Sequence, residues 1–272
     1  MAELAKKKTW TAVLVIPPVI FLIVVGPSAA LIAMVLLATF FGLREYFLLA
    51  LPHAQGRERF VATGLGLILS FLTAQGDAKV LCPFFVLLLL LLSLLFMTTS
   101  RTLASAISNL GITLFGILFI GFLLSHISLM RTLSNGREWV LFLIVTVWAA
   151  DISAYLVGSL LGKHKLYPKI SPNKTYEGLA GAVLGSMIVA LAFSILFIPD
   201  LKKGTVALLA IGIGVLGQVG DFTESMLKRS AQVKDSGSLF PGHGGMLDRL
   251  DSFLFSAPFL HYSLLYLVKE PL

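Results

Sequence analysis

The chain has 272 residues, of which 57% are hydrophobic and only 13% are charged, and its mean hydropathy is +0.92. Soluble globular domains carry about 25% charged residues, so this composition excludes a soluble enzyme, a disordered chain and a fibrous repeat. It predicts a polytopic membrane protein. The net charge of +7 does not indicate nucleic-acid binding, because the longest basic run is only Lys6–Lys8 and membrane proteins collect Lys and Arg in cytoplasmic loops. The single cysteine, Cys82, excludes an intramolecular disulfide.

Apolar runs separated by polar residues predict an all-α fold with about nine transmembrane helices, in a single membrane domain over residues 1–272. The first helix contains Pro17 and Pro18, which predict a kink. The third helix is short, which is typical of a tilted or partly re-entrant segment. The predicted helices cover residues 10–25, 28–50, 61–76, 80–98, 103–130, 138–162, 176–198, 204–230 and 246–268.

Basic residues fall unevenly between alternate loops. With a cytoplasmic N-terminus, 15 of the 21 Lys and Arg residues lie on the cytoplasmic side, as the positive-inside rule requires. The long polar loops 163–175 and 229–245 then share that side. Polar residues within predicted helices concentrate in the second half of the chain. We therefore expect residues 1–135 to be mainly scaffold and residues 136–272 to be the catalytic half.

Acidic residues lie inside or at the rim of the predicted helices, where a charge is costly and usually functional. Asp221, Glu224 and Lys228 fall at i, i+3 and i+7, so they share one helix face. Asp248 and Asp251 are also three residues apart, at the start of the last helix. This pattern favours two helix ends that line a watery cavity.

Residues 241–245, Pro-Gly-His-Gly-Gly, lie between these two acidic pairs. The glycines predict a loop whose backbone N–H groups can approach phosphate oxygens, and the loop leads into a helix N-terminus, which favours anions. With the carboxylates, this favours Mg²⁺ plus a polyphosphate. Each part also has a simpler interpretation: a structural ion pair, a glycine turn, or a hydrogen-bonding loop role for His243. The basic residues nearby are Lys228, Arg229, Lys234 and Arg249.

A second polar patch covers residues 169–178. It is interpreted either as a helix start, with Ser171 as N-cap and Pro172 at the first helical position, or as an anion site. The anion site would explain Lys174, because a cation is disfavoured near a helix N-terminus. Asp151 is expected to face the same cavity. Its helix face continues with Tyr155, Gly158 and Gly162, where the glycines serve close helix packing equally well.

These motifs resemble those of CDP-diacylglycerol synthases (phosphatidate cytidylyltransferases). The resemblance to that family's signature spans residues 225–251, and Ser171 to Gly178 resemble its second common motif. The first 135 residues agree only in hydropathy. The signature residues are Ser225-Met226-Leu227-Lys228-Arg229, Lys234-Asp235-Ser236-Gly237, Leu239-Phe240-Pro241-Gly242-His243-Gly244-Gly245 and Asp248-Arg249-Leu250-Asp251.

The resemblance implies that CTP and phosphatidic acid react to give CDP-diacylglycerol and pyrophosphate. It implies a divalent metal, normally Mg²⁺, with a second cation as an option, and a homodimeric all-helical fold in the cell (inner) membrane. The candidate catalytic residues are Asp221, Asp248, Lys174, Asp235 and Arg249. The candidate substrate-binding residues are Ser171, Lys228, Arg229, Lys234, His243, Gly244 and Gly245. The candidate metal ligands are Asp221, Asp248, Glu224 and Asp251.

In the expected reaction, a phosphate oxygen of phosphatidic acid attacks the α-phosphorus of CTP. The site is then expected to be a funnel-like cavity near the cytoplasmic surface, open to water for CTP and to the leaflet for the lipid. Two other functions stay open. A CTP-dependent polyprenol or phytol kinase would release CDP instead of pyrophosphate. An ion-coupled transporter also uses intramembrane carboxylates, but this chain has no evident repeat.

Overall fold

A computed structural model of the protein describes residues 16–52, 54, 56–240 and 244–269, and these residues are mostly helical. Two π-helical segments, η1 (Ile117–Phe122) and η2 (Leu264–Val268), continue neighbouring α-helices without a break. The first described helix covers Ile16–Val25. The later helices are α2 (Ser28–Ala50), α3 (Gly56–Gln75), α4 (Ala78–Thr99), α5 (Leu103–Gly116), α6 (Leu123–Met130), α7 (Gly136–Leu161), α8 (Tyr176–Phe197), α9 (Lys203–Ser230) and α10 (Leu247–Ser263).

The all-α prediction is confirmed, and each predicted helix has a counterpart within a few residues. Among the described residues, six helical segments are long and apolar enough to cross a membrane. They are α2, α4, the continuous segment Leu103–Met130, α7, α8 and α9. The chain is therefore a membrane protein. A total of nine spans stays a prediction, because α3 begins with charged residues, α10 is shorter and carries Asp248 and Asp251, and the first helix is described only from Ile16.

The predicted kink at Pro17 and Pro18 belongs to a helix whose earlier part lies outside the described residues. In the described part, both prolines fall within the first turn after Ile16. The kink itself stays a prediction. The third helix, predicted to be short, is a regular α-helix of 20 residues.

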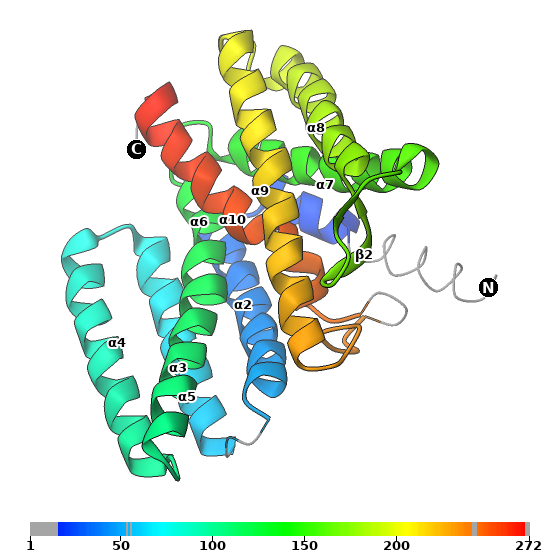
Figure 1. Cartoon of the computed structure of the whole chain (residues 1–272). Helices are drawn as coiled ribbons and strands as arrows, with labels where there is room; N and C mark the ends of the chain where they lie inside the picture. The colour runs from blue at the N-terminus through cyan, green and yellow to red at the C-terminus, as the bar shows by residue number, and fades with distance from the viewer. Residues whose placement is uncertain (1–15, 53, 55, 241–243, 270–272) are drawn as a thin grey trace.

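The helices form two groups (Figure 1). Helices α2 to α6 pack together around α3 and η1, and α7, α8 and α9 pack against one another. Helix α10 packs against α9 and also against α6 and α2, so it joins the groups. The buried core between them is apolar and aromatic, and Trp139, Phe142 and Phe47 are among its largest fully buried side chains.

A short hairpin between α7 and α8 was not predicted. Strand β1 (Lys165–Tyr167) pairs antiparallel with β2 (Ser171–Thr175). The interpretation of Ser171 as a helix N-cap is wrong, since Ser171 lies in β2 and Thr175 caps α8 by accepting a hydrogen bond from Gly178 N–H at 3.0 Å. The strands of this hairpin are too short and too polar to show a hydrophobic alternation in the sequence.

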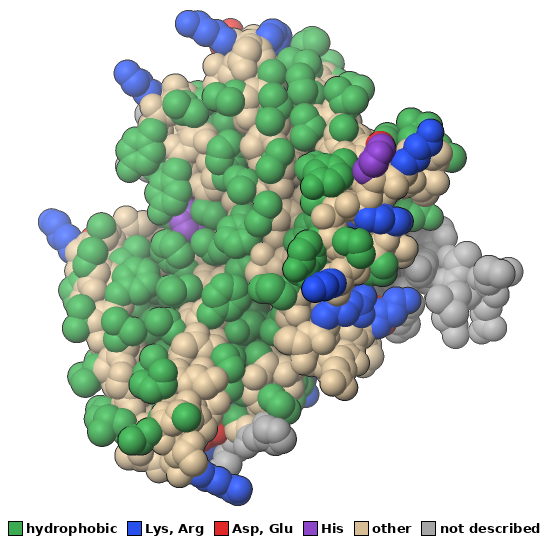
Figure 2. All heavy atoms as spheres, viewed as in Figure 1, with side chains coloured by type: hydrophobic (Ala, Val, Ile, Leu, Met, Phe, Trp, Pro, Cys, Tyr) green, Lys and Arg blue, Asp and Glu red, His purple; other side chains and the backbone are tan. Residues whose placement is uncertain are grey.

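Glu177 fixes the other end of the hairpin. Its carboxylate accepts hydrogen bonds from the backbone N–H groups of Lys163 and His164, and lies 2.6 Å from His164 Nδ1. The hairpin is therefore tied to the first turn of α8 at both strands. Lys and Arg side chains gather over this hairpin and the neighbouring end of α9, while hydrophobic side chains cover much of the remaining visible face (Figure 2).

The close packing of α7 on α8 should depend on Gly181. A Cβ there would lie 2.6 Å from Val157 Cβ and 2.9 Å from Ser153 O, so Gly181→Val would force the helices apart. Overpacking of this kind typically costs about 1–3 kcal/mol. We expect a lower melting temperature in detergent for Gly181→Val than for Gly64→Val. Gly64 is a matched control, because it is also helical and a Cβ there meets nothing within 4 Å. Equal melting temperatures would contradict this account of the interface.

Candidate active site

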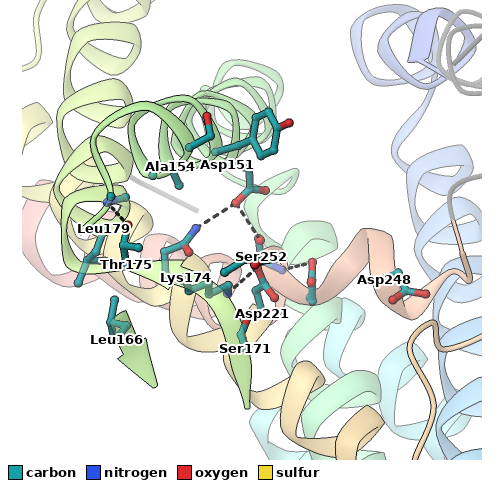
Figure 3. Close-up of a pocket in the computed structure, with 18 of the residues that line it drawn as sticks. Asp151, Ala154, Leu166, Ser171, Lys174, Thr175, Leu179, Asp221, Asp248 and Ser252 are labelled. Atoms are coloured by element: carbon teal, nitrogen blue, oxygen red, sulfur yellow. Dashed lines mark hydrogen bonds and ion pairs between the residues drawn. The ribbon is translucent and has the colours of Figure 1, made fainter. Parts of the chain in front are cut away.

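A cavity of about 800 Å³ lies between α7, the hairpin, α9 and the start of α10. Figure 3 shows its lining, with Asp151, Lys174, Asp221 and Ser252 gathered in one part and Asp248 toward one side. Most of the candidate residues from both motifs meet here, although they are far apart in the sequence. The candidate residues that line the cavity are Asp151, Ser171, Lys174, Asp221, Lys228, Arg229, Lys234, Asp235, Asp248, Arg249 and Asp251.

Three carboxylates lie close together beside the cavity; Asp221 and Asp251 line it, whereas Glu224 is fully buried behind it. Asp221 and Glu224 come from α9 and Asp251 from α10, and one oxygen of each lies within 4.8 Å of the others. The two helices approach closely at Gly220, which has no Cβ. A Cβ there would overlap the Asp251 carbonyl oxygen. Three carboxylates this close repel one another unless cations or protons lie among them. Their hard oxygen donors are the type that Mg²⁺ prefers, so this set fits a divalent metal. We call Asp221, Glu224 and Asp251 the acidic cluster.

Lys228 links this cluster to Asp248. Its ammonium forms ion pairs with Glu224 and with Asp248 Oδ1, the latter at 2.7 Å. Glu224 is fully buried, and the Lys228 and Asp248 side chains are mostly buried. Asp248 Oδ2 also accepts hydrogen bonds from the backbone N–H groups of Gly245 and Ser236, both at 2.8 Å. The carboxylate of Asp248 is thus held by a cation and two N–H groups, and its role as a metal ligand stays a prediction.

Lys174 is paired with a carboxylate of α9, and the bound anion predicted for it stays a prediction. Its Nζ lies 2.6 Å from Asp221 Oδ2 and 4.2 Å from the centre of the Phe222 ring. The hairpin places Lys174 against α9. The second sequence motif therefore lies beside the acidic cluster. Lys174 lines the cavity, while its Nζ is buried against Asp221.

Arg229 anchors the hairpin to the loop that follows α9. Its guanidinium donates to the carbonyl oxygens of Ile170 and Val233, both at 3.2 Å. This ties the turn between β1 and β2 to the segment that carries Lys234 and Asp235. Both of these residues line the cavity. Arg229 therefore closes one wall of the cavity as well as adding positive charge to it.

The glycines of the predicted phosphate loop have a different neighbour in the structure. His243 lies outside the described residues. Gly244 has a φ of +81°, and a Cβ there would lie 2.5 Å from Asp248 Oδ2. A Cβ at Gly245 would overlap Glu45 Oε2. The two glycines thus let the backbone wrap around carboxylates of the protein, and phosphate binding by them stays a prediction.

Asp151 lies in the same cavity, on α7. Its Oδ1 accepts hydrogen bonds from Gln218 Nε2 at 3.3 Å and Ser252 Oγ at 3.2 Å. Gly158 lines the cavity and also packs closely, since a Cβ there would lie 3.3 Å from Thr175 Oγ1. Both interpretations of the α7 glycines therefore hold.

Glu45 and Ser236 lie next to the site without lining the cavity, and neither was among the candidate site residues. Glu45 lies on α2, is 8% exposed, and accepts hydrogen bonds from the loop before α10. A usable signal was present, because Glu45 is an acidic residue within the predicted helix 28–50. The rule that intramembrane carboxylates are functional would have included it.

The fold and site define a helical membrane protein with a cavity suited to a cation and phosphates. Sequence comparison is more specific: a profile of the cytidylyltransferase family matches residues 6–267, so the chain belongs to that family. The chain is 37% identical to the phosphatidate cytidylyltransferase of Bacillus subtilis (strain 168) over 95% of its length and 97% of the relative's. It is 43% identical to the Staphylococcus saprophyticus enzyme of that name over 56% of this chain and 58% of the relative. It is 45% identical to the Staphylococcus aureus (strain COL) enzyme over 54% and 55%, respectively.

Lys228→Met should destabilise the protein strongly. Removing the ammonium leaves Glu224 buried and Asp248 without its cation, and breaking a buried ion pair in this way costs about 3–5 kcal/mol. We expect a large drop in the melting temperature in detergent. The double variant Lys228→Met/Glu224→Gln should recover part of the lost stability, because the buried Glu224 side chain would no longer carry a charge. Lys163→Met is the control, since Lys163 is exposed. A single variant as stable as this control would show that Lys228 does not hold the carboxylates together.

Proposed function

We propose that this protein is a phosphatidate cytidylyltransferase, which transfers the cytidylyl group of CTP to phosphatidic acid and releases pyrophosphate. The observation that carries this proposal is the joining of a charged cavity to an apolar groove. CTP is water-soluble and highly anionic, whereas phosphatidic acid has an anionic headgroup on two acyl chains. An enzyme for both substrates needs compartments of opposite polarity with the reacting phosphates between them.

The apolar groove has a volume of about 410 Å³ and shares Asp151, Asp248, Arg249 and Asp251 with the charged cavity. Its other walls are mostly aliphatic and aromatic side chains from the Ile16–Val25 helix, α2, α6, α7 and α10. Leu37 lines it and is 57% exposed, so the groove reaches the outer surface of α2. This supports the predicted funnel-like cavity, with lipid entry from the leaflet and the phosphate headgroup at the shared residues.

The acidic cluster would hold the divalent metal, which we propose to be Mg²⁺. When bound, Mg²⁺ offsets phosphate charge during phosphoryl transfer. The cluster differs in part from the pair that the family resemblance implied, because Asp221 belongs to it and Asp248 is bound to Lys228 instead. Glu224 and Asp251 complete the set of oxygen donors. A second cation at this site stays open.

The basic residues of the cavity would bring the two anionic substrates together. Lys174 from the hairpin and Arg249 from α10 approach from different elements, so they can bind phosphates of two molecules. The lipid phosphate needs no strong general base, since the second pKa of a phosphomonoester is about 6 and the nucleophilic oxygen is already ionised near neutral pH. Its oxygen forms the new bond to the CTP α-phosphorus, and the bond to the pyrophosphate oxygen breaks. Lys228, Arg229 and Lys234 would stabilise the charge on the leaving group.

We further propose that the protein lies in the inner membrane with its site on the cytoplasmic side, and that it is a homodimer. The charge bias of the loops supports the orientation, since most basic residues lie on the side of the two long polar loops. The lining of the charged cavity begins at Asp151, which supports the division into a scaffold half and a catalytic half. The groove draws on both halves. The family resemblance is the support for a dimer.

The proposal is tested with full-length protein in detergent micelles that contain phosphatidic acid, Mg²⁺ and CTP labelled at the α-phosphorus. Cytidylyl transfer moves the label into the lipid fraction and releases one pyrophosphate for each labelled lipid. A lipid kinase would leave the label in soluble CDP. Protein that labels no lipid with phosphatidic acid, but moves a solute across proteoliposomes, would be a transporter instead.

Asp221→Asn should reduce the turnover number by at least about 100-fold, because loss of a direct ligand should exceed the 10–100-fold cost typical of its outer-shell partners. The melting temperature should change much less than for Lys228→Met, since asparagine keeps the size of the side chain and the relief of repulsion from Glu224 and Asp251 offsets the loss of the Lys174 ion pair. The control is Asp200→Asn, an exposed acid in the turn between α8 and α9. Labelled-lipid formation at different Mg²⁺ concentrations measures both variants. Near-normal turnover of Asp221→Asn would remove this residue from the metal site.

A further inference from the structure

Glu45 contacts the loop of residues 234–246 between α9 and α10, here called the signature loop, from the opposite half of the chain. Its Oε1 accepts a hydrogen bond from Met246 N–H, and its Oε2 accepts one from Leu247 N–H, both at 2.9 Å. These N–H groups belong to the start of α10, where no intrahelical acceptor exists for them. A carboxylate at a helix N-terminus also interacts favourably with the helix dipole. Glu45 thus caps α10 from a helix that lies about 200 residues earlier in the chain.

Ser236 connects Glu45 to Asp248. Its Oγ lies 2.8 Å from Glu45 Oε2 and 2.9 Å from Asp248 Oδ2, so one hydroxyl hydrogen faces two carboxylates. Ser236 N–H also donates to Asp248 Oδ2 at 2.8 Å. A displacement of Glu45 would therefore move both the residue that orients Asp248 and the helix turn on which Asp248 is carried.

The loop backbone follows the Glu45 carboxylate closely. A Cβ at Gly237 would lie 2.6 Å from Glu45 Oε1, and one at Gly245 would overlap Oε2. Only glycine permits this approach without displacing the carboxylate. The two glycines come from opposite ends of the signature loop, so Glu45 fixes the loop at both ends.

We propose that Glu45 is a positioning residue of the catalytic site, which sets the place of Asp248 through Ser236 and the first turn of α10. This inference rests on the proposed function for its kinetic readout. Glu45 does not line the charged cavity. It acts on the substrates through Asp248, which shares Lys228 with the acidic cluster and lies where the cavity and the groove meet.

Glu45→Gln is the most direct variant, because glutamine keeps the size of the side chain but offers one acceptor oxygen in place of two. Its NH₂ group would face the N–H of Met246 or Leu247, donor against donor. We expect kcat/KM for CTP to fall about 10-fold or more, with a raised KM. A merely structural defect would lower the active fraction and therefore kcat, and would leave KM unchanged.

Limited trypsin digestion gives a second readout that needs no substrate. Lys234 is exposed and lies in the loop that Glu45 holds. Lys165 lies in β1 of the hairpin, which is joined to this loop through Arg229 and has no contact with Glu45 among those described. In Glu45→Gln, cleavage after Lys234 should accelerate while cleavage in the hairpin keeps its wild-type rate. Gly245→Ala, which displaces the carboxylate from the loop side, should show the same two effects, and Asp200→Asn should show neither.

The proposal is overturned if Glu45→Gln keeps the wild-type KM and loop cleavage rate. It is also overturned if cleavage accelerates equally in the loop and the hairpin, because that would be general destabilisation. If Glu45→Gln does not fold, Gly245→Ala decides by the same criteria. Failure of the proposed function is distinct, since the wild-type protein would then label no lipid while the cleavage pattern still tests Glu45.

Discussion

Lys228 occupies the position on which the rest of the site depends, between the buried carboxylates of Glu224 and Asp248. Carboxylates are expensive to bury at the edge of a membrane unless a cation accompanies them. One ammonium here binds α9 to α10 and links Asp248 to the acidic cluster. The cluster itself retains Lys174 as its neighbouring cation, through Asp221. The charged cavity thus brings together acids and bases from α7, the hairpin, α9 and α10.

The two halves of the chain cooperate more than their composition suggests. The second half supplies every residue of the charged cavity, yet the groove beside it is lined by Ile16–Val25 and α2. Glu45 on α2 caps α10 and reaches the signature loop. The helices of the first half therefore do more than fill the membrane, since they shape the place where lipid and nucleotide would meet.

The helices were readable from the sequence because a membrane span needs an apolar run long enough to be unmistakable. The predicted range 28–50 is the observed range of α2. The hairpin was missed, since residues 165–175 make local backbone bonds with no apolar pattern. Asp221, Glu224 and Asp251 could be selected as candidates from their helical spacing. Which of the four carboxylates share a cluster and which is bound to Lys228 depends on how α9 and α10 cross, and no local pattern encodes this.

For a similar reason, the sequence could not show which residues Glu45 contacts. Its partners are about 190–200 residues away, and each contact is to a backbone N–H or a serine. Such contacts leave no charge pairing or periodicity to read. The glycines nearby were visible, but their purpose was assigned to phosphate because the carboxylate they accommodate is distant in the sequence.

The shared wall of the groove and the cavity has a consequence for inhibition. A compound that joins a short acidic head to a single alkyl chain would place one end in each compartment, with its linker beside Arg249. An enzyme whose phosphate site has no adjoining apolar groove could hold only the acidic head. Selectivity would then come from geometry that such enzymes do not share, and the bilayer would concentrate the compound at the groove entrance.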